Sequence, residues 1–305
     1  MDKSYLRQAE LVVRCIPAIA AEECFALKGG TAINLFELDL PRLSVDIDLA
    51  FLPATERVTA IAKINAALSR IAGRLQARGV AARLRGTDEA RKIVCSANGA
   101  EIKIEPNYIL RGTVRPARRI ELSPKMAGLV GLSAEMTVLS REELYGGKFC
   151  AALDRQHPRD LFDVAQFFKR GGSVRDVKDG FLALAMGHNR PLDELLAPHP
   201  LNQSATFAVQ FAGMSDVPFS LAEHETVFKR LVVEIDEALT QEDRRRLVAF
   251  TALEADADIF GIPGLEKLPA IQWKRRNLET LRNRNPRKFA ENVKALEVVL
   301  RTAST

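Results

Sequence analysis

Two aspartates separated by one residue, Asp46 and Asp48, are the side chains of this sequence most suited to chemistry. They lie in a run of alternating polar and apolar residues that predicts a β-strand. Because side chains alternate between the two faces of a strand, both carboxylates point the same way. Neighbouring carboxylates repel each other unless a cation lies between them, and hard divalent metals prefer oxygen ligands. The pair therefore predicts a metal site completed by phosphates.

A glycine-rich turn, Gly29-Gly30-Thr31, precedes this strand and leads into a short apolar run. Ser44 and, if the strand begins early enough, Arg42 share the face of the aspartates. Alternating polarity by itself is equally typical of a solvated edge strand. The turn and the residues that follow favour the site.

A third carboxylate and a lysine lie further along the chain. Glu105 occupies a strand-like run at 101–109, and its alternative interpretation is a solvent-facing glutamate paired with Lys103. Lys148 lies on a helix that Ser140 begins in a capping-box pattern. On such a helix a lysine is usually solvated, but this one directly follows two interior glycines, which indicate that another segment approaches the backbone closely.

A second helix is expected to begin at Pro158 and to run to about residue 169. Asp160 falls in its first turn, where an acid favours the helix dipole, so we assign the functional role to Asp163 instead. Arg155 is either a ligand for phosphate or a surface charge with an acidic partner.

The hydrophobic pattern predicts a mixed α/β core followed by helices alone, with a boundary near residue 170 between a catalytic domain, 1–170, and a helical C-terminal domain, 171–305. Strands are expected at 80–84, 92–96 and 101–109, with an edge strand in 113–123. Helices are expected at 4–16, 18–26, 55–78, 221–239, 241–255 and 286–302.

The composition is that of an ordinary globular protein, with 47% hydrophobic and 27% charged residues in 305. The four cysteines are widely spaced, which indicates reduced thiols of a cytoplasmic protein and argues against a zinc site. We expect no secretory leader and no membrane span. A monomer is expected because no heptad pattern is present.

Positive charge is concentrated near the C-terminus. Residues 267–301 hold ten Lys or Arg against three Glu, although the whole chain carries only +5. Such a segment suits a polyanion, and a solvated helical tail is an equally good interpretation. Trp273, the only tryptophan, is expected to be a packing anchor for the C-terminal helices, with base stacking as the alternative.

The ordered combination of these motifs resembles the AbiEii/AbiGii toxin family of the DNA polymerase β-like nucleotidyltransferases. The matching segments span nearly the whole chain. They are Lys28-Gly-Gly-Thr-Ala32, Arg42-x-Ser-x-Asp-Ile-Asp-Leu49, Ile102-Lys-Ile-Glu-Pro-Asn-Tyr108, Glu143-Leu-x-x-x-Lys148, Asp154-Arg-x-x-x-Arg-Asp-Leu-Phe-Asp163 and Leu268-Pro-Ala-Ile-Gln-Trp-Lys274.

The resemblance implies a polymerase β-like core that transfers a nucleoside monophosphate from an NTP and releases pyrophosphate. Asp46, Asp48 and Glu105 would hold Mg²⁺ or Mn²⁺, and Glu105 would also deprotonate the acceptor. The remaining roles concern the nucleotide and its phosphates. Gly29, Gly30 and Thr31 would cradle the phosphates, Lys148 would reach the triphosphate, Arg42 and Arg155 would add guanidinium forks, Ser44 would line the nucleotide site and Asp163 would supply a further catalytic acid.

The same resemblance implies a toxin of a toxin–antitoxin or abortive-infection pair, with a cognate antitoxin and an RNA acceptor such as tRNA. The sequence departs from the broader superfamily in carrying Thr31 in place of Ser and Glu105 in place of Asp. Both changes keep the functional group. Nucleotidylation of a small molecule or a protein, and nucleotide or RNA binding without turnover, are the alternative functions.

Overall fold

The computed structural model describes residues 3–301, which form two compact units. The first contains the chain up to Ser140 together with Ala208–Pro218. The second contains Arg141–Phe207 and the chain from Phe219 onward. The functional boundary predicted near residue 170 stays a prediction.

The first unit is built on a seven-stranded sheet with the strand order β3-β4-β5-β2-β1-β7-β6. Strands β2 and β5 pair in parallel, as do β1 and β7, and the other neighbours are antiparallel, so the predicted mixed sheet is confirmed. The strands are β1 (Phe25–Lys28), β2 (Asp46–Phe51), β3 (Ala81–Arg85), β4 (Lys92–Ala97), β5 (Ala100–Arg111), β6 (Arg118–Glu121) and β7 (Glu135–Val138).

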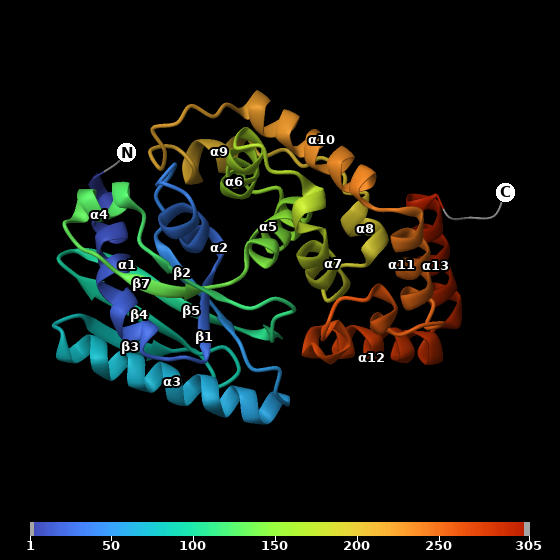
Figure 1. Ribbon diagram of the computed structural model, residues 1–305, viewed down its shortest axis with the longest axis horizontal. Coiled ribbons are helices and arrows are strands. Elements are labelled where there is room, and N and C mark those ends of the chain that lie inside the picture. Colours follow the sequence, from blue (N-terminus) through green and yellow to red (C-terminus); the bar gives the residue numbers. More distant parts are fainter. Residues whose placement is uncertain (1–2, 302–305) are drawn as a thin grey trace. The chain divides into compact units, whose positions relative to one another are not determined.

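Two helices, α1 (Lys3–Ala20) and α3 (Arg57–Ala77), cover the apolar face of this sheet (Figure 1). That face is formed by fully buried residues such as Ile47, Ile93 and Ile104. A hydrogen bond between the thiols of Cys15 in α1 and Cys95 in β4 joins helix to sheet, and with burial it raises the pKa of Cys15. The apolar residues thus leave the opposite face of β2, β4 and β5 to polar side chains.

The N-terminal elements differ from the sequence-based expectation. Helix α1 continues through Pro17 to Ala20, and the helix expected at 18–26 is wrong because strand β1 begins at Phe25. A buried run as short as Phe25–Lys28 has no periodicity that separates strand from helix. Two further elements were not predicted, α4 (Pro124–Val130) and β7.

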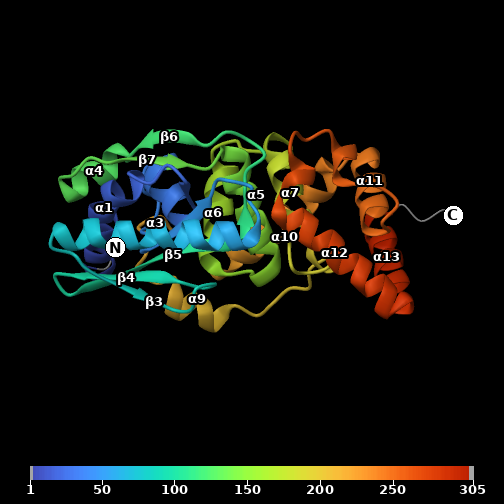
Figure 2. The same ribbon diagram turned by 90° about the horizontal axis from the view of Figure 1, so that it is seen from below.

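The described residues of the second unit, 141–207 and 219–301, form helices joined by loops and contain no strand. Helices are confirmed at the three predicted places, although α11 ends at Thr251 and not at 255, and α13 ends at Leu300, with residue 302 outside the described residues. Thr240 caps α11 in the expected manner. Figures 1 and 2 show α12 and α13 side by side. The helices are α5 (Arg141–Arg155), α6 (Pro158–Lys169), α7 (Lys178–Met186), α8 (Leu192–Leu196), α10 (Leu221–Ala238), α11 (Gln241–Thr251), α12 (Pro269–Arg284) and α13 (Pro286–Leu300); α9 (Ser204–Gln210) lies where the chain passes between the two units.

The glycines inside α5 are explained by the packing of α7 against it. A Cβ atom on Gly146 would lie 2.5 Å from the backbone at Gly180 and Phe181, and one on Gly180 would lie 2.2 Å from the carbonyl oxygen of Glu142. The two backbones are therefore in direct contact, which confirms the predicted close approach.

No helix within residues 3–301 is long and apolar enough to cross a membrane.

Candidate active site

A row of charged side chains crosses four adjacent strands on the polar face of the sheet. In the register, Asp48 of β2 lies opposite Lys28 of β1 on one side and Glu105 of β5 on the other. Opposed residues on neighbouring strands are about 5 Å apart and share a face. Asp46, two residues before Asp48, shares that face, as predicted. The sheet therefore brings the three predicted metal-binding carboxylates together.

Lys92 of β4 completes the row, and its ammonium donates a hydrogen bond to Glu105 across 2.8 Å. This hydrogen bond, with the charges of Glu105 and Asp46, raises the pKa of Lys92. The ion pair expected from the sequence as an alternative, between Glu105 and Lys103, is replaced by this one. Lys92 was missed, because its partner depends on the strand register, which the sequence pattern does not fix.

The glycine turn lies directly against the first of these carboxylates. Gly29 has a φ of +70°, which favours glycine, and a Cβ atom there would lie 2.6 Å from Oδ2 of Asp48. A Cβ atom on Gly30 would lie 2.6 Å from Nη2 of Arg42. The turn opens a helical segment, Gly29–Glu37, whose first N–H groups lack partners within the helix and suit an anion.

Three of the predicted nucleotide-binding residues are buried beside or within the glycine turn. Thr31, Arg42 and Ser44 are all buried, with exposed fractions of 1%, 2% and 8%. The Thr31 hydroxyl contacts the Ser44 hydroxyl at 2.9 Å and also the carbonyl oxygen of Asp46. Their geometry holds the turn and the aspartate strand in one position, and their direct contact with a nucleotide stays a prediction.

The donor set at this face suits a hard divalent cation. Mg²⁺ is usually held by one or two protein carboxylates together with substrate phosphates. Asp46 and Asp48 supply two carboxylates, and the glycine turn beside them suits the phosphates. Within residues 3–301 no group of three or more His, Cys, Asp or Glu is already arranged as a metal site. The third carboxylate, Glu105, forms an ion pair with the ammonium of Lys92.

The other predicted catalytic side chains form a separate ionic cluster within the second unit. Lys148 of α5 donates to Oδ1 of Asp160 at 2.7 Å and lies 3.0 Å from Oδ2 of Asp163, both on α6. Arg155 donates from Nε to Asp160 at 2.6 Å. The interpretation of Lys148 as a solvated surface lysine is wrong, since its side chain is 7% exposed.

The two aspartates of this cluster are almost fully buried, and each has a cationic partner. Burial favours the neutral acid, but the charge of Lys148 and the hydrogen bond from Arg155 outweigh it and hold the pKa of Asp160 below its ordinary value. Asp160 also lies in the first turn of α6, as predicted. His157 caps this helix by accepting a hydrogen bond from the N–H of Arg159 at 3.1 Å.

Comparison with known proteins identifies the family. Residues 10–290 match the family described as "Nucleotidyl transferase AbiEii toxin, Type IV TA system". The chain belongs to this family. It is thus a nucleotidyltransferase toxin of a type IV toxin–antitoxin system, as its motifs predicted.

A solved structure has the same fold. MenT4, a nucleotidyltransferase toxin from Mycobacterium tuberculosis H37Rv, superposes with a TM-score of 0.58 at 14% sequence identity. The match covers 97% of this chain and 93% of MenT4. No curated protein matches this chain. The resemblance in fold extends over both units.

Proposed function

We propose that this AbiEii-family enzyme transfers a nucleoside monophosphate from an NTP to an RNA acceptor, with tRNA as the preferred class, and depends on Mg²⁺ or Mn²⁺. The observation that carries the proposal is the row on the sheet: Asp46 and Asp48 on one face, Glu105 opposite Asp48, and the glycine turn in contact with Asp48. Carboxylates beside a phosphate-binding turn are what nucleotidyl transfer requires.

When bound, a divalent metal would supply activation of the acceptor hydroxyl and charge neutralisation for the triphosphate and the leaving pyrophosphate. Asp46 and Asp48 would hold it, and Glu105 would be the third carboxylate of the set. The N–H groups of Gly29 and Gly30 bind phosphate oxygens. Thr31, Ser44 and Arg42 keep the turn rigid. Glu105 accepts the proton of the attacking hydroxyl.

By the resemblance of their segment to the family, we assign Lys148 and Arg155 to the triphosphate and Asp163 to the catalytic set. Arg155 is the member best placed to contact an anion, since its side chain is 60% exposed while Nε holds Asp160. A cognate antitoxin belongs to a system of this type, and we propose that the toxin acts in the cytoplasm, where NTPs and RNA are found.

The test is a labelling experiment. The protein is incubated with each NTP labelled at the α-phosphate, with Mg²⁺ and total RNA, and the RNA, protein and small-molecule fractions are separated. Label in RNA that EDTA abolishes supports the proposal. Label confined to protein or to small molecules would replace RNA as the acceptor, and no label in any fraction, from folded protein, would refute the transfer activity.

A matched pair of variants makes the result specific to the site. Asp48→Asn removes a metal ligand, whereas Glu101→Gln changes an exposed acid of β5 four residues before Glu105. We expect the first variant to lose labelling and the second to retain it. Retention of full labelling by folded Asp48→Asn would contradict the proposed site.

A further inference from the structure

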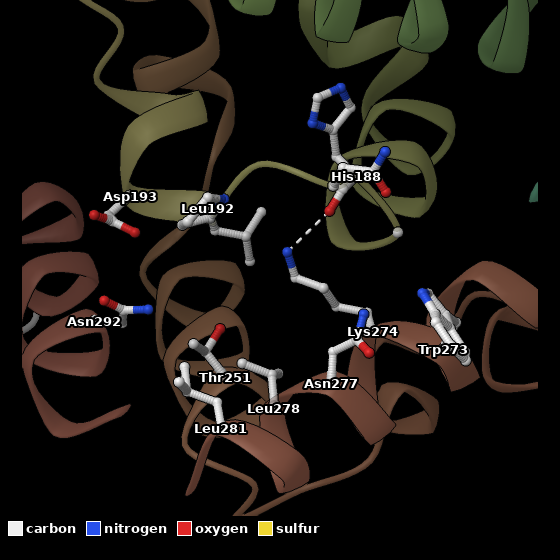
Figure 3. A pocket seen from close by; sticks show the side chains of 13 residues that line it. His188, Leu192, Asp193, Thr251, Trp273, Lys274, Asn277, Leu278, Leu281 and Asn292 are labelled. Carbon is white, nitrogen blue, oxygen red and sulfur yellow. Dashed lines mark hydrogen bonds between the residues drawn. The ribbon is translucent and has the colours of Figure 1, made fainter. Parts of the chain in front are cut away.

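The second unit contains a cavity of about 170 Å³ that the proposed catalytic residues do not use (Figure 3). It lies between α12, the beginning of α13 and the segment that joins α7 to α8. Because a water molecule occupies about 30 Å³ of liquid, the cavity could hold roughly six waters or one small planar ring system. Its size therefore fits a single nucleobase.

A lysine ammonium forms one wall of this cavity. Nζ of Lys274 donates hydrogen bonds to the carbonyl oxygens of His188 at 2.9 Å and Arg190 at 3.0 Å, and Figure 3 shows it reaching across from α12. Burial lowers the pKa of Lys274, and no carboxylate within residues 3–301 lies within ion-pair distance of its Nζ. Since an ammonium has three N–H donors, these two carbonyls leave one for a ligand in the cavity.

The remaining lining combines apolar surface with groups that can donate and accept hydrogen bonds. Leu192, Leu278 and Leu281 supply the apolar part. The amides of Asn277 and Asn292 face the cavity from α12 and α13 together with the carboxylate of Asp193 (Figure 3). Amide and carboxylate groups are those that recognise the edges of bases, whose flat faces pack on apolar surface.

Trp273 lies at the edge of the cavity, and its indole is 52% exposed. The expectation that it anchors the packing of the C-terminal helices is wrong. Exposing the apolar surface of an indole to water is unfavourable. The exposed ring does, however, provide a face on which a base can stack. Trp273 therefore suits a second base next to the one in the cavity.

Cationic side chains lie next to the cavity on both helices. On α12, Arg284 follows Asn277 and Leu281 by seven and three residues, which places it on the same helix face. On α13, Lys288 precedes Asn292 by one turn, and its charge acts on Asp193. Both cations are exposed. A free base would not need them, whereas the phosphates on either side of a base in a polynucleotide would.

We propose that this cavity is a base-binding subsite for single-stranded RNA: one base enters between Asn277 and Asn292, a neighbouring base stacks on Trp273, and Arg284 and Lys288 bind the flanking phosphates. The subsite deepens the function proposed above, on which it rests for its role in holding the acceptor. Its binding of RNA is independent of metal and of nucleotidyl transfer.

The experiment uses the intrinsic fluorescence of Trp273, the only tryptophan of the chain. The full-length protein is titrated in EDTA with a single-stranded oligoribonucleotide of mixed sequence and, separately, with a nucleoside 5′-monophosphate. We expect the RNA to quench the fluorescence in a saturable way and the mononucleotide to do so at least about tenfold more weakly, because it lacks the second base and the flanking phosphates. Absence of quenching by RNA, or equal affinity for the mononucleotide, overturns the proposal.

Two cavity variants and one control assign the signal to the cavity. Asn277→Leu and Asn292→Leu fill it with an apolar group and keep Trp273, and each should raise the Kd for RNA by about tenfold. Asn283→Leu places the same change on an exposed position of α12 outside the cavity lining and should leave Kd unchanged. Circular dichroism identifies any variant that fails to fold. Unchanged affinity in both folded cavity variants overturns the proposal.

The two proposals fail in different ways. RNA that quenches Trp273 but is never labelled removes the transfer activity and leaves the subsite intact. Labelled RNA combined with an unchanged Kd and KM for RNA in both folded variants, Asn277→Leu and Asn292→Leu, removes the subsite and leaves the transfer activity intact.

Discussion

Two groups of acidic side chains, one in each unit, have different surroundings. On the sheet of the first unit, Asp46, Asp48 and Glu105 are partly exposed and lie side by side. In the second unit, Asp160 and Asp163 are buried, with Lys148 between them. The first group leaves room for an external cation, whereas the carboxylates of the second group are already paired with the ammonium of Lys148.

The two glycine pairs follow the same division. Gly29 and Gly30 make room for side chains, those of Asp48 and Arg42, whereas Gly146 makes room for the backbone of α7. A substitution in the first pair disturbs charged groups of the site, and one in the second disturbs helix packing. Identical residue types thus make room for charged side chains in one unit and for a helix backbone in the other, and the difference predicts which measurement each mutation will change.

The largest effect is expected from Asp48→Asn, which should lower the rate of nucleotidyl transfer by about three orders of magnitude, because a metal ligand is lost. The same change removes repulsion from Asp46 and Glu105 together with attraction to Lys28, so the free energy of unfolding should change little. Transfer rates with labelled NTP and urea unfolding measure the two quantities. A large loss of stability would show that Asp48 also has a structural role.

Lys148→Met, in contrast to Asp48→Asn, should lower the free energy of unfolding. Removing the cation leaves Asp160 and Asp163 buried without it, which costs about 3–5 kcal/mol in the free energy of unfolding. Lys169→Met is the control, because Lys169 is 51% exposed and its pair with Glu223 spans 3.8 Å. Such a surface pair contributes at most about 1 kcal/mol. Equal effects in urea unfolding would show that burial of the cluster contributes nothing.

Gly146→Ala should destabilise the second unit by about 1–3 kcal/mol, since the added methyl group meets the backbone of α7 at 2.5 Å. Its neighbour offers a matched control. A methyl group on Gly147 meets only the side chain of Leu184, at 3.3 Å, and alanine is favoured over glycine in a helix by up to about 1 kcal/mol. Thermal unfolding measures the stability of both variants. If Gly147→Ala were less stable than Gly146→Ala, this account would be contradicted.

The smallest effect is a pH dependence of the buried cluster. The pKa of Asp160 is held below its ordinary value of 3.8, so its ionised form stabilises the folded state above that pH. This contribution is lost as the pH falls below 3.8 towards the pKa of the folded state. The stability difference between the wild type and Asp160→Asn should therefore narrow over that range. Urea unfolding at pH 7 and between pH 4 and 2 measures it, and a constant difference would exclude the linkage.

The sequence predicted those features that depend on local pattern. The amphipathic helix at 55–78, the helices after residue 220 and the shared face of Asp46 and Asp48 follow from periodicity alone. The interior glycines of α5 indicated a close neighbour because glycine is costly in a helix. The family resemblance supplied the roles of these residues.

Features that depend on how distant segments pair were not predictable in the same way. The ion pair between Lys92 and Glu105 follows from the register of β4 on β5, and the burial of Lys148 follows from the packing of α6 against α5. Strand β1 was missed because it has only four residues, three of them buried and apolar, too few to show a strand periodicity. In each case the local sequence pattern is compatible with two structures, and tertiary contacts determine which one forms.

The hydrogen-bonded thiols of Cys15 and Cys95, buried between α1 and the sheet, have a kinetic consequence. A thiol reagent reaches them only while the first unit is open, and it reaches the buried Cys150 only while the second is open. The time course of alkylation at each cysteine therefore reports separately on the opening of each unit. The partly exposed Cys24 provides a fast internal reference.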